Sequence, residues 1–334
     1  MSVAAERTDA VTAPARGLVG LVGDTPLLEL RSVSDGLPHR ILGKCEFLNP
    51  GGSVKDRIGH RILAEAERAG LITPGRTRLV EATAGNTGVG LAVAAAGRYR
   101  LTCTMSSKMG PEKEALLRAW GAEVVRCPYE VSPDDPTSFI NTAKRLAEQD
   151  PDAFFVDQFN RDWNVAAHYD STGVEVLEQT GGNLAAFVAG VGTGGTLTGV
   201  ARRLRDAGSP ARIVLADPVG SVLAAAVAGR PQQAAPYSIE GIGGDFVPAL
   251  FDSELVTDTV TVSDADAVRM CLTVAERDGV LVGGSSGCAL VAARRFARSL
   301  PGAGRDIVVL LADGGDRYLS TIYDADWRRG KGIS

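Results

Sequence analysis

Short apolar segments alternate with amphipathic helical segments along most of this 334-residue chain. The apolar run at 76–82, for example, is followed by a helical pattern at 89–98. Equivalent strand-and-helix pairs are expected at 99–105 with 111–122, 123–129 with 137–149, 184–191 with 197–208, 211–217 with 221–229, and 279–284 with 288–300, before a last strand at 305–313. Repeated strand–helix–strand units build parallel sheets covered by helices, so the pattern predicts an α/β fold with two such sheets.

One helix begins in an unusual way. Residues 49–57, NPGGSVKDR, lead directly into an apolar-patterned helix at 58–70. The two glycines and Ser53 suit a helix start, but Lys55 does not, because a helix N-terminus carries roughly half a positive charge. Asp56 could offset this charge, or the lysine could extend into solvent. The other interpretation is that the amine is needed in its neutral form, as a base or as the partner of a Schiff base.

The bulk composition limits the classes of function. The chain is 45% hydrophobic and 22% charged, with a net charge of −5, which leaves no basic face for nucleic acid or an anionic membrane. Its five cysteines are scattered without a C-x-x-C pair, as is typical of reduced cytosolic proteins. No apolar run approaches the roughly 18 residues of a membrane span, and residues 1–17 lack the apolar core of a signal peptide. We expect a soluble, cytoplasmic protein.

Three junctions between a strand and a helix are rich in glycine and hydroxyl residues. They are EATAGNTGVG at 81–90, GVGTGGTLTG at 190–199 and GGSSGCA at 283–289. Ligands of open α/β sheets collect where strands end and helices begin. Each junction therefore brings free backbone N–H groups and the positive end of a helix to one place, which favours binding of an anion.

The second junction also matches a dinucleotide-binding fingerprint. Gly190, Gly192 and Gly195 satisfy G-x-G-x-x-G, and Asp217 follows at the end of the next strand. Against this interpretation, the loop contains several threonines, whose hydroxyls suit the oxygens of a terminal phosphate. The second cradle at 83–88 also has no role in such a fingerprint.

The third junction resembles the nucleophile elbow of a hydrolase. Residues 283–287 match G-x-S-x-G, but that chemistry needs a histidine after the serine in the chain. The histidines are His39, His60 and His168, all before it, and their spacing does not suit a metal site. We therefore expect neither hydrolase chemistry nor a bound metal, and the chain also has no G-x-x-x-x-G-K-[ST] phosphate loop.

Several motifs together identify a family. GKCEFLNPGGSVKDRIGHRILAEAERAG, AGNTG, GVGTGGTLTGVARRL, EGIGGDFVP and GGSSG occur in order along the chain. In these motifs the sequence resembles the fold-type II, β-family pyridoxal-phosphate enzymes of the cysteine synthase and cystathionine β-synthase type, from about residue 23 to about residue 327. The resemblance implies two three-layer α/β domains with parallel-rich twisted sheets, similar to the tryptophan synthase β subunit, and pyridoxal 5′-phosphate as cofactor.

The resemblance also implies roles for individual residues. Lys55 would form the Schiff base with the cofactor, Asn86 would hydrogen-bond the phenolic oxygen of its ring, and Ser285 would face the pyridine nitrogen. The phosphate would be held by Gly192, Thr193, Gly194, Gly195 and Thr196. The α-carboxylate of the substrate would be bound by Thr83, Gly85, Asn86, Thr87 and Gln158. His168, Asp313, Asp316 and Arg317 are interpreted as packing or loop residues, and Asp245 as either a loop cap or a residue that orients the loop.

A serine beside the pyridine nitrogen has a chemical consequence. A neutral hydroxyl does not keep that nitrogen protonated, so the ring is a weaker electron sink and loss of a β-substituent is favoured over transamination. Lys55, once freed, would take the Cα proton. The expected reaction is β-replacement on serine or an O-activated serine through an aminoacrylate, which gives cysteine or a cystathionine-type thioether.

The resemblance further predicts a smaller domain at 50–157 and a larger one made of 1–49 and 158–334. Homodimers are usual among relatives, and amino acids are the expected substrates. Because the given sequence ends at Ser334 and residues 1–17 contain no cysteine or histidine, we expect neither the regulatory nucleotide-sensing modules nor the haem site of the animal and yeast enzymes.

Two departures from the family pattern leave the substrates open. Ala84 stands where a serine is usual, and Gly244 where an aromatic or acidic residue is common. The same chemistry could therefore serve an amine or another nucleophile to make a non-protein amino acid of the diaminopropionate type. A relative that binds the cofactor or a partner without turnover, and a serine or threonine dehydratase, also remain as alternatives.

Overall fold

The strands of this protein form two separate sheets. The computed structural model describes residues 15, 17–132 and 134–333. The larger sheet has the strand order β1 (Leu27–Glu29), β2 (Arg40–Cys45), β10 (Asp306–Leu311), β7 (Leu184–Ala189), β8 (Arg212–Pro218) and β9 (Asp258–Val262). The smaller sheet has the order β5 (Glu123–Cys127), β4 (Arg100–Ser106), β3 (Arg78–Ala82) and β6 (Ala153–Phe155). Neighbouring strands are parallel throughout, except that β1 is antiparallel to β2.

Helices connect nearly all of these strands. The α-helices are α1 (Arg31–Ser34), α2 (Lys55–Arg68), α3 (Asn86–Ala95), α4 (Pro111–Ala119), α5 (Phe139–Glu148), α6 (Trp163–Ala167), α7 (Gly173–Gln179), α8 (Gly195–Asp206), α9 (Leu223–Val227), α10 (Asp264–Arg277), α11 (Gly284–Ser299) and α12 (Ala325–Gly330). Shorter 3₁₀ turns are η1 (Leu18–Leu21), η2 (Glu46–Leu48), η4 (Ser253–Leu255) and η5 (Gly315–Tyr318), and η3 (His168–Thr172) is a π-helical turn.

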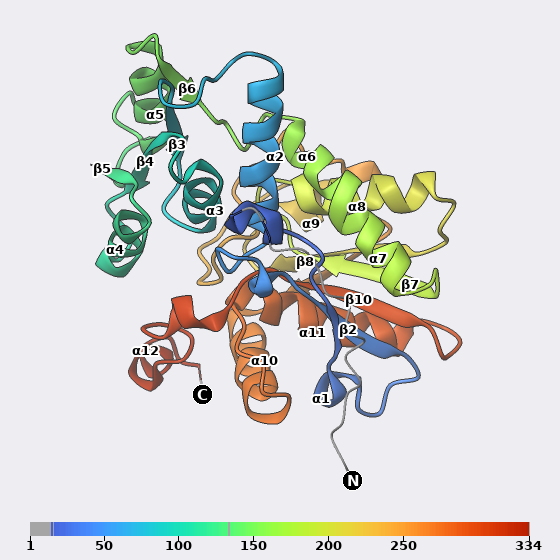
Figure 1. Ribbon diagram of the computed structural model, residues 1–334. Helices are drawn as coiled ribbons and strands as arrows, with labels where there is room; N and C mark the ends of the chain where they lie inside the picture. Colours follow the sequence, from blue (N-terminus) through green and yellow to red (C-terminus); the bar gives the residue numbers. More distant parts are fainter. Residues whose placement is uncertain (1–14, 16, 133, 334) are drawn as a thin grey trace.

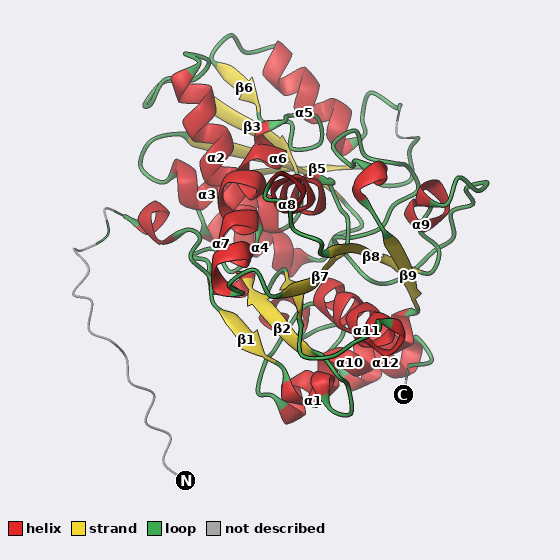
Figure 2. Cartoon of the chain, turned by 90° about the vertical axis from the view of Figure 1, so that its right-hand side faces the viewer, coloured by secondary structure: helices red, strands yellow, loops and turns green. Residues whose placement is uncertain are grey.

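Each sheet is covered by helices on both faces. Helices α10 and α11 pack on one face of the six-stranded sheet, and α7 and α8 lie on the other (Figure 2). The four-stranded sheet lies between α5 on one side and α2, α3 and α4 on the other, in the upper left of Figure 1. This arrangement confirms the predicted fold of two three-layer α/β domains.

The central strands show why their sequences lack a polar alternation. Every residue of β7 (LAAFVA) and of β10 (DIVVLL) is buried, because helices cover both of their faces. The edge strand β9 (DTVTV) has only one buried residue. Continuous apolar runs therefore mark the middle of the larger sheet.

The prediction of a strand at 279–284 is wrong. This segment makes only an isolated bridge, between Val282 and Gly314, in the short connection from α10 to α11. Val280 and Val282 are buried against the core, whereas Leu281 between them is exposed. Conversely, the strands β1, β2, β6 and β9 lie outside the predicted strand–helix pairs.

Candidate active site

A cleft of about 1080 Å³ lies where the two sheets face each other. Its walls come from the segments that follow the carboxyl ends of β3, β7 and β10, and from the first turns of α2 and α11. This is the edge at which ligands bind in parallel α/β sheets, and the volume is that of a small-molecule site. Of the sequence-predicted site residues, those lining the cleft are Lys55, Thr83, Gly85, Asn86, Thr87, Gln158, Gly192, Thr193, Gly194, Thr196 and Ser285.

Lys55 is the first residue of α2, and its side chain lines the cleft. The preceding turn is tied to the larger sheet, because the Val54 amide donates a hydrogen bond to the Ala312 carbonyl at 2.8 Å. Burial lowers the pKa of the Lys55 amine, and the negative charge of Asp313 opposes this only in part. The amine has no hydrogen-bond or ion-pair partner among the residues described. A lysine in this state is suited to nucleophilic attack on a carbonyl group.

The helix that begins with Lys55 is anchored by a buried ionic cluster. Arg57, in the first turn of α2, pairs with Glu46 at 2.7 Å and with Glu175 at 2.6 Å. Glu175 also pairs with Lys44 at 2.5 Å, and the Lys44 side chain is fully buried. Burial alone would raise the pKa of Glu175, but the hydrogen bonds and charges of Arg57 and Lys44 lower it to about 2. Two cations and two carboxylates thus neutralise each other and hold the start of α2 against the larger sheet.

Asn86 and Asp313 meet inside the cleft. Asn86 begins α3, and its Nδ2 donates to the Oδ2 of Asp313 at 2.7 Å, which also accepts from the Tyr318 hydroxyl at 2.7 Å. The Asn86 Oδ1 accepts from Arg317. The remaining oxygen of Asp313, Oδ1, is buried without a partner within the described chain, and burial raises the pKa of this carboxyl group. Asp313, interpreted from the sequence as a loop residue, is therefore part of the cleft beside Lys55.

The segment between β3 and α3 is held in place by hydrogen bonds that involve the Gln158 amide and the Glu81 carboxyl group. The Thr87 hydroxyl donates to Gln158 Oε1 at 2.7 Å, and Gln158 Nε2 donates to Glu81 Oε1 at 3.0 Å. The Thr83 hydroxyl accepts from the Gly85 amide at 3.2 Å. Burial raises the pKa of Glu81 to about 8, so this carboxyl group is protonated at neutral pH. One proton of the Gln158 amide is thus committed to Glu81, which leaves the other for a ligand.

The loop at 192–196 joins β7 to the N-terminus of α8. Gly194 has a φ of 93°, in the region that favours glycine. A Cβ on Gly192 would lie 2.4 Å from a carbonyl oxygen of a neighbouring loop, so only glycine allows this close approach. The hydroxyls of Thr193 and Thr196 line the cleft together with the first backbone N–H groups of α8. Such a loop has the geometry of an anion cradle without any basic side chain.

Ser285 is the second residue of the 16-residue helix α11. Its side chain faces the cleft and has no hydrogen-bond partner in the described part of the chain, whereas the neighbouring Ser286 accepts a hydrogen bond from the Ala312 amide at 3.0 Å. No histidine is hydrogen-bonded to Ser285 among the described residues. The Ser285 hydroxyl can therefore face a neutral ligand atom.

The alternatives raised by the glycine motifs find no support. Asp217, the acidic residue of the dinucleotide fingerprint, is fully buried and accepts a hydrogen bond from the Ala224 amide at 2.8 Å, so it is committed to the start of α9. Within residues 17–132 and 134–333, no group of three or more metal-ligating side chains is close enough to hold a metal ion.

The two residues that depart from the family pattern, Ala84 and Gly244, line the cleft. Lys113 of α4 forms an ion pair with Glu240 across the opening. Phe246 is 52% exposed, and its ring lies 6.3 Å from that of Phe159. This part of the cleft is therefore charged and partly aromatic, and it is bordered by α4 and by connecting segments.

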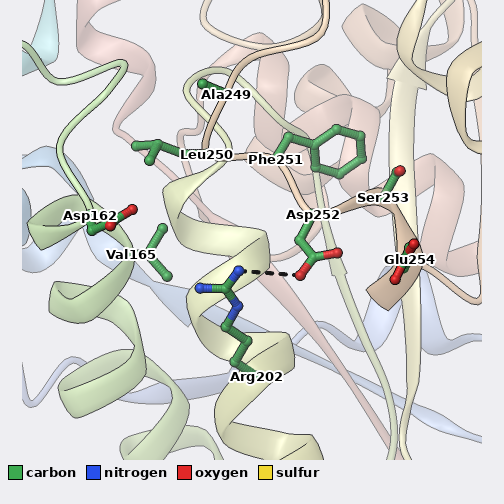
Figure 3. Close-up of a pocket in the computed structure, with 9 residues that line it drawn as sticks. All are labelled: Asp162, Val165, Arg202, Ala249, Leu250, Phe251, Asp252, Ser253 and Glu254. Carbon is green, nitrogen blue, oxygen red and sulfur yellow. Dashed lines mark hydrogen bonds and ion pairs between the residues drawn. The ribbon is translucent and has the colours of Figure 1, made fainter.

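A second, smaller pocket of about 360 Å³ lies behind the 192–196 loop, on the outer side of α8 (Figure 3). Its charged side chains are Asp162, Arg202, Asp252 and Glu254, and Arg202 is already paired with Asp252 at 3.2 Å. Figure 3 shows this pair spanning the pocket. With its cation paired and its other charged groups acidic, this pocket offers no site for an anionic ligand.

Sequence reasoning missed the side chains that support the site from behind. Glu81, Asn164 and Asp313 are buried and contact the predicted residues, and His168 does so through Thr196. Their partners are far away in the sequence, so no local pattern could reveal them. The only available signal is the presence of polar residues in apolar surroundings.

Comparisons with known proteins agree on one family. The family described as "Pyridoxal-phosphate dependent enzyme" matches residues 18–313. Cystathionine beta-synthase of Mus musculus is 41% identical over 315 residues, which are 93% of this chain and 56% of the mouse protein. The enzyme of that name from Dictyostelium discoideum is 42% identical over 311 residues, or 92% of this chain and 61% of the relative. This chain therefore spans only about three fifths of the length of these relatives.

A solved structure has the same fold. The crystal structure of a hydrogen sulfide-producing enzyme from Fusobacterium nucleatum superimposes with a TM-score of 0.84 and 31% identity, and the match covers 92% of this chain and 99% of the other. These similarities support pyridoxal-phosphate β-replacement chemistry in general.

None of the helices described here is both long and apolar enough to cross a membrane.

Proposed function

Because this chain belongs to the family of pyridoxal-phosphate dependent enzymes, we propose that it catalyses β-replacement on serine or an O-activated serine. A thiol replaces the β-substituent, and the product is cysteine or a cystathionine-type thioether. The curated relatives named cystathionine beta-synthase support this reaction type. The observation that carries the proposal is that Lys55, Asn86 and Ser285 line one cleft with four residues of the 192–196 loop, all except Gly195.

The residues of the cleft fit pyridoxal 5′-phosphate. Lys55 offers an amine without a partner, as a Schiff base requires. In the loop that would receive the phosphate, neighbouring backbone atoms leave no space for a side chain at Gly192 or Gly194. When bound, the cofactor supplies a conjugated ring that accepts the electron pair left at the substrate Cα.

The protein side chains have distinct tasks in the proposed reaction. Lys55, with a pKa lowered by burial, would take the Cα proton at Nζ. The Thr83 hydroxyl, the backbone N–H groups of Asn86 and Thr87 that follow Gly85, and the free amide proton of Gln158 would bind the substrate carboxylate. Ser285 would give the ring nitrogen a neutral partner, which favours loss of the β-substituent.

We also propose a smaller domain at 50–157 and a larger one made of 1–49 and 158–334, since the strands of the smaller sheet all fall between residues 78 and 155. A homodimer and a cytoplasmic location remain predictions.

A second reaction is suggested by the name of the solved relative. The Fusobacterium nucleatum protein is a hydrogen sulfide-producing enzyme. The same cleft would release sulfide if cysteine supplied the β-substituent and another thiol or water replaced it. Both reactions use the same residues and differ only in which amino acid enters first.

Absorbance tests the cofactor assignment. The purified protein, incubated with pyridoxal 5′-phosphate, is expected to show a band near the visible edge, and borohydride is expected to label the peptide that contains Lys55. Lys55→Ala should lack both signals, whereas Lys113→Ala, which removes another cleft lysine, should retain them. A band that survives in Lys55→Ala would refute the assignment.

The substrates are then tested in combination. Serine, O-acetylserine, O-phosphoserine and cysteine are each supplied with sulfide, homocysteine or a diamine, and the products are identified by mass spectrometry. Cysteine or a thioether from a serine donor supports the main proposal, and sulfide released from cysteine supports the second. A product formed only with the amine would overturn both in favour of synthesis of a non-protein amino acid.

A further inference from the structure

A polar face of the segment 163–172 packs against the phosphate loop on the side away from the cleft. The segment consists of α6 and the π-helical turn η3, and it contacts α8 (Figure 1). A Cβ on Gly195 would lie 1.9 Å from Asn164 Oδ1, and one on Gly199 would lie 2.8 Å from the Cβ of His168. The two glycines of α8 thus allow Asn164 and His168 to reach the loop. π-Helical turns occur frequently at functional sites.

Asn164 sets the direction of the hydrogen bond made by Thr193. Its Nδ2 donates to the Gln158 carbonyl at 2.9 Å and to the Thr193 hydroxyl oxygen at 2.9 Å. The carbonyl of Gln158 can only accept, so the amide nitrogen must face it, and both amide protons are then used. The Thr193 hydroxyl accepts from Asn164, which leaves its own proton for another acceptor. Since Thr193 lines the cleft, that proton is available to a bound anion.

His168 occupies the corresponding position behind Thr196. Its Nε2 lies 3.1 Å from the Thr196 hydroxyl and its Nδ1 lies 2.9 Å from the Thr172 hydroxyl. The ring is completely buried, and its pKa is held well below the ordinary value by burial first and then by the charges of Arg57 and Lys55, against which Glu175 acts. A neutral ring carries one proton, on either Nδ1 or Nε2.

The two tautomers have different effects on the loop. With the proton on Nε2, His168 donates to Thr196 and accepts from Thr172, so the Thr196 proton is free for the cleft. With the proton on Nδ1, Thr196 must donate to His168 and presents only lone pairs to the cleft. A phosphate dianion accepts hydrogen bonds and does not donate them, so it selects the first arrangement.

We propose that Asn164 and His168 are positioning residues for cofactor binding, which hold the Thr193 and Thr196 hydroxyls as acceptors so that both hydroxyl protons point to the phosphate. The segment 190–199 contains no lysine or arginine, so the phosphate depends on hydroxyl and backbone donors for its stabilisation. Hydrogen bonds to a charged group are stronger than those between neutral groups. The inference concerns the cofactor alone and does not depend on the proposed substrates.

Pyridoxal, which lacks the phosphate, provides the comparison that isolates this role. The affinity of the cofactor-free protein is measured by absorbance for pyridoxal 5′-phosphate and for pyridoxal. In His168→Leu and in Asn164→Asp, the affinity for pyridoxal 5′-phosphate should fall by about 10-fold to 100-fold. The affinity for pyridoxal should change by no more than about twofold. His168→Gln, which can place an amide N–H near the former Nε2, should recover most of the loss.

Two further measurements complete the test. In the background of Thr196→Val, His168→Leu should add no further loss, because the hydroxyl through which His168 acts is already gone. In the wild-type holoenzyme, the ¹⁵N shifts of His168 should show a neutral ring protonated on Nε2, a readout that does not require any variant to fold. Equal losses for pyridoxal and its phosphate, or a ring protonated on Nδ1, would overturn the proposal.

Discussion

The Asn86 amide donates to the Asp313 carboxylate at 2.7 Å, although 227 positions separate the two residues in the chain. The contact joins the first turn of α3, beside the smaller sheet, to the segment after the last strand of the larger sheet. Burial lowers the pKa of the Lys55 amine in the same cleft, and the negative charge of Asp313 opposes this shift in part. One carboxylate therefore influences both the amide and the lysine that we expect to contact the cofactor.

Asp313→Asn is predicted to lower the pKa of Lys55 further. The substitution removes the negative charge that opposes the effect of burial, so the amine becomes neutral at a lower pH. The pH dependence of the rate at which the cofactor-free protein condenses with pyridoxal measures this shift. The rate should reach its plateau at a lower pH than in the wild type. Tyr318→Phe, which removes a hydrogen bond to Asp313 but keeps its charge, serves as the control, and an unchanged midpoint in Asp313→Asn would contradict the prediction.

Glu81 should make the protein less stable as the pH rises. Its pKa is raised to about 8 in the folded protein, from an ordinary value of 4.5. Between these values the folded state binds the proton and the unfolded state does not, so the free energy of unfolding falls with increasing pH. Glu81→Gln removes this dependence and should gain about 3 to 4 kcal/mol relative to the wild type between pH 5 and pH 8.

Chemical denaturation at several pH values measures the effect of Glu81. The exposed Glu148 provides a matched control, and Glu148→Gln should run parallel to the wild type. If Glu81→Gln also runs parallel to the wild type over this range, the carboxyl group is ionised in the folded protein and the prediction is wrong.

The ionic cluster behind α2 gives a prediction about stability. Arg57→Ala leaves Glu46 and Glu175 buried without their main cation, and we expect a loss of about 3 to 5 kcal/mol in the free energy of unfolding. Arg61→Ala, one turn further along the same helix, removes a partly exposed pair with Asp170 and should cost less than about 1 kcal/mol. Urea denaturation of the two variants compares them directly. Similar losses would show that burial does not decide the strength of these pairs.

Gly195→Ala should damage the 192–196 loop. The added Cβ would lie 1.9 Å from the Asn164 amide oxygen, which has no space to move because the Asn164 amide nitrogen is bonded on its other side. We expect a loss of about 2 kcal/mol in stability and weaker binding of pyridoxal 5′-phosphate. Gly330→Ala, with no atom within 4 Å of the added carbon, is the control and should be neutral. Thermal denaturation and a cofactor titration test both variants.

Part of the architecture could be read from local patterns. The runs at 184–191 and 305–313 were predicted as strands because buried strands are continuously apolar, and they correspond to β7 and β10. The segment 279–284 has a similar pattern, yet it forms no strand and makes only an isolated bridge from Val282 to Gly314. Apolar composition indicates burial, but pairing depends on which other strand is present.

The candidate site also has features that the local sequence predicted and contacts that only the folded chain shows. The motif around Lys55 marked an unusual lysine at a helix start, and the glycine-rich segments predicted an anion cradle, because these features arise within a few consecutive residues. The assignment of Gln158 as a donor to the substrate carboxylate stays a prediction, and the structure adds that one of its amide protons is bonded to Glu81. That partner is 77 positions away and could not be inferred from the sequence.

The sequence by itself determined the alternation of strands and helices, the loops with free backbone N–H groups and the misplaced cation of Lys55, since each depends on neighbours within one turn or one strand. Only the tertiary structure decided which buried polar groups meet, as Asn164 does with Thr193 and Asn86 with Asp313. The physical reason is that periodicity encodes which side of an element is buried, whereas a hydrogen-bond partner is chosen by strand order and the close approach of separate segments.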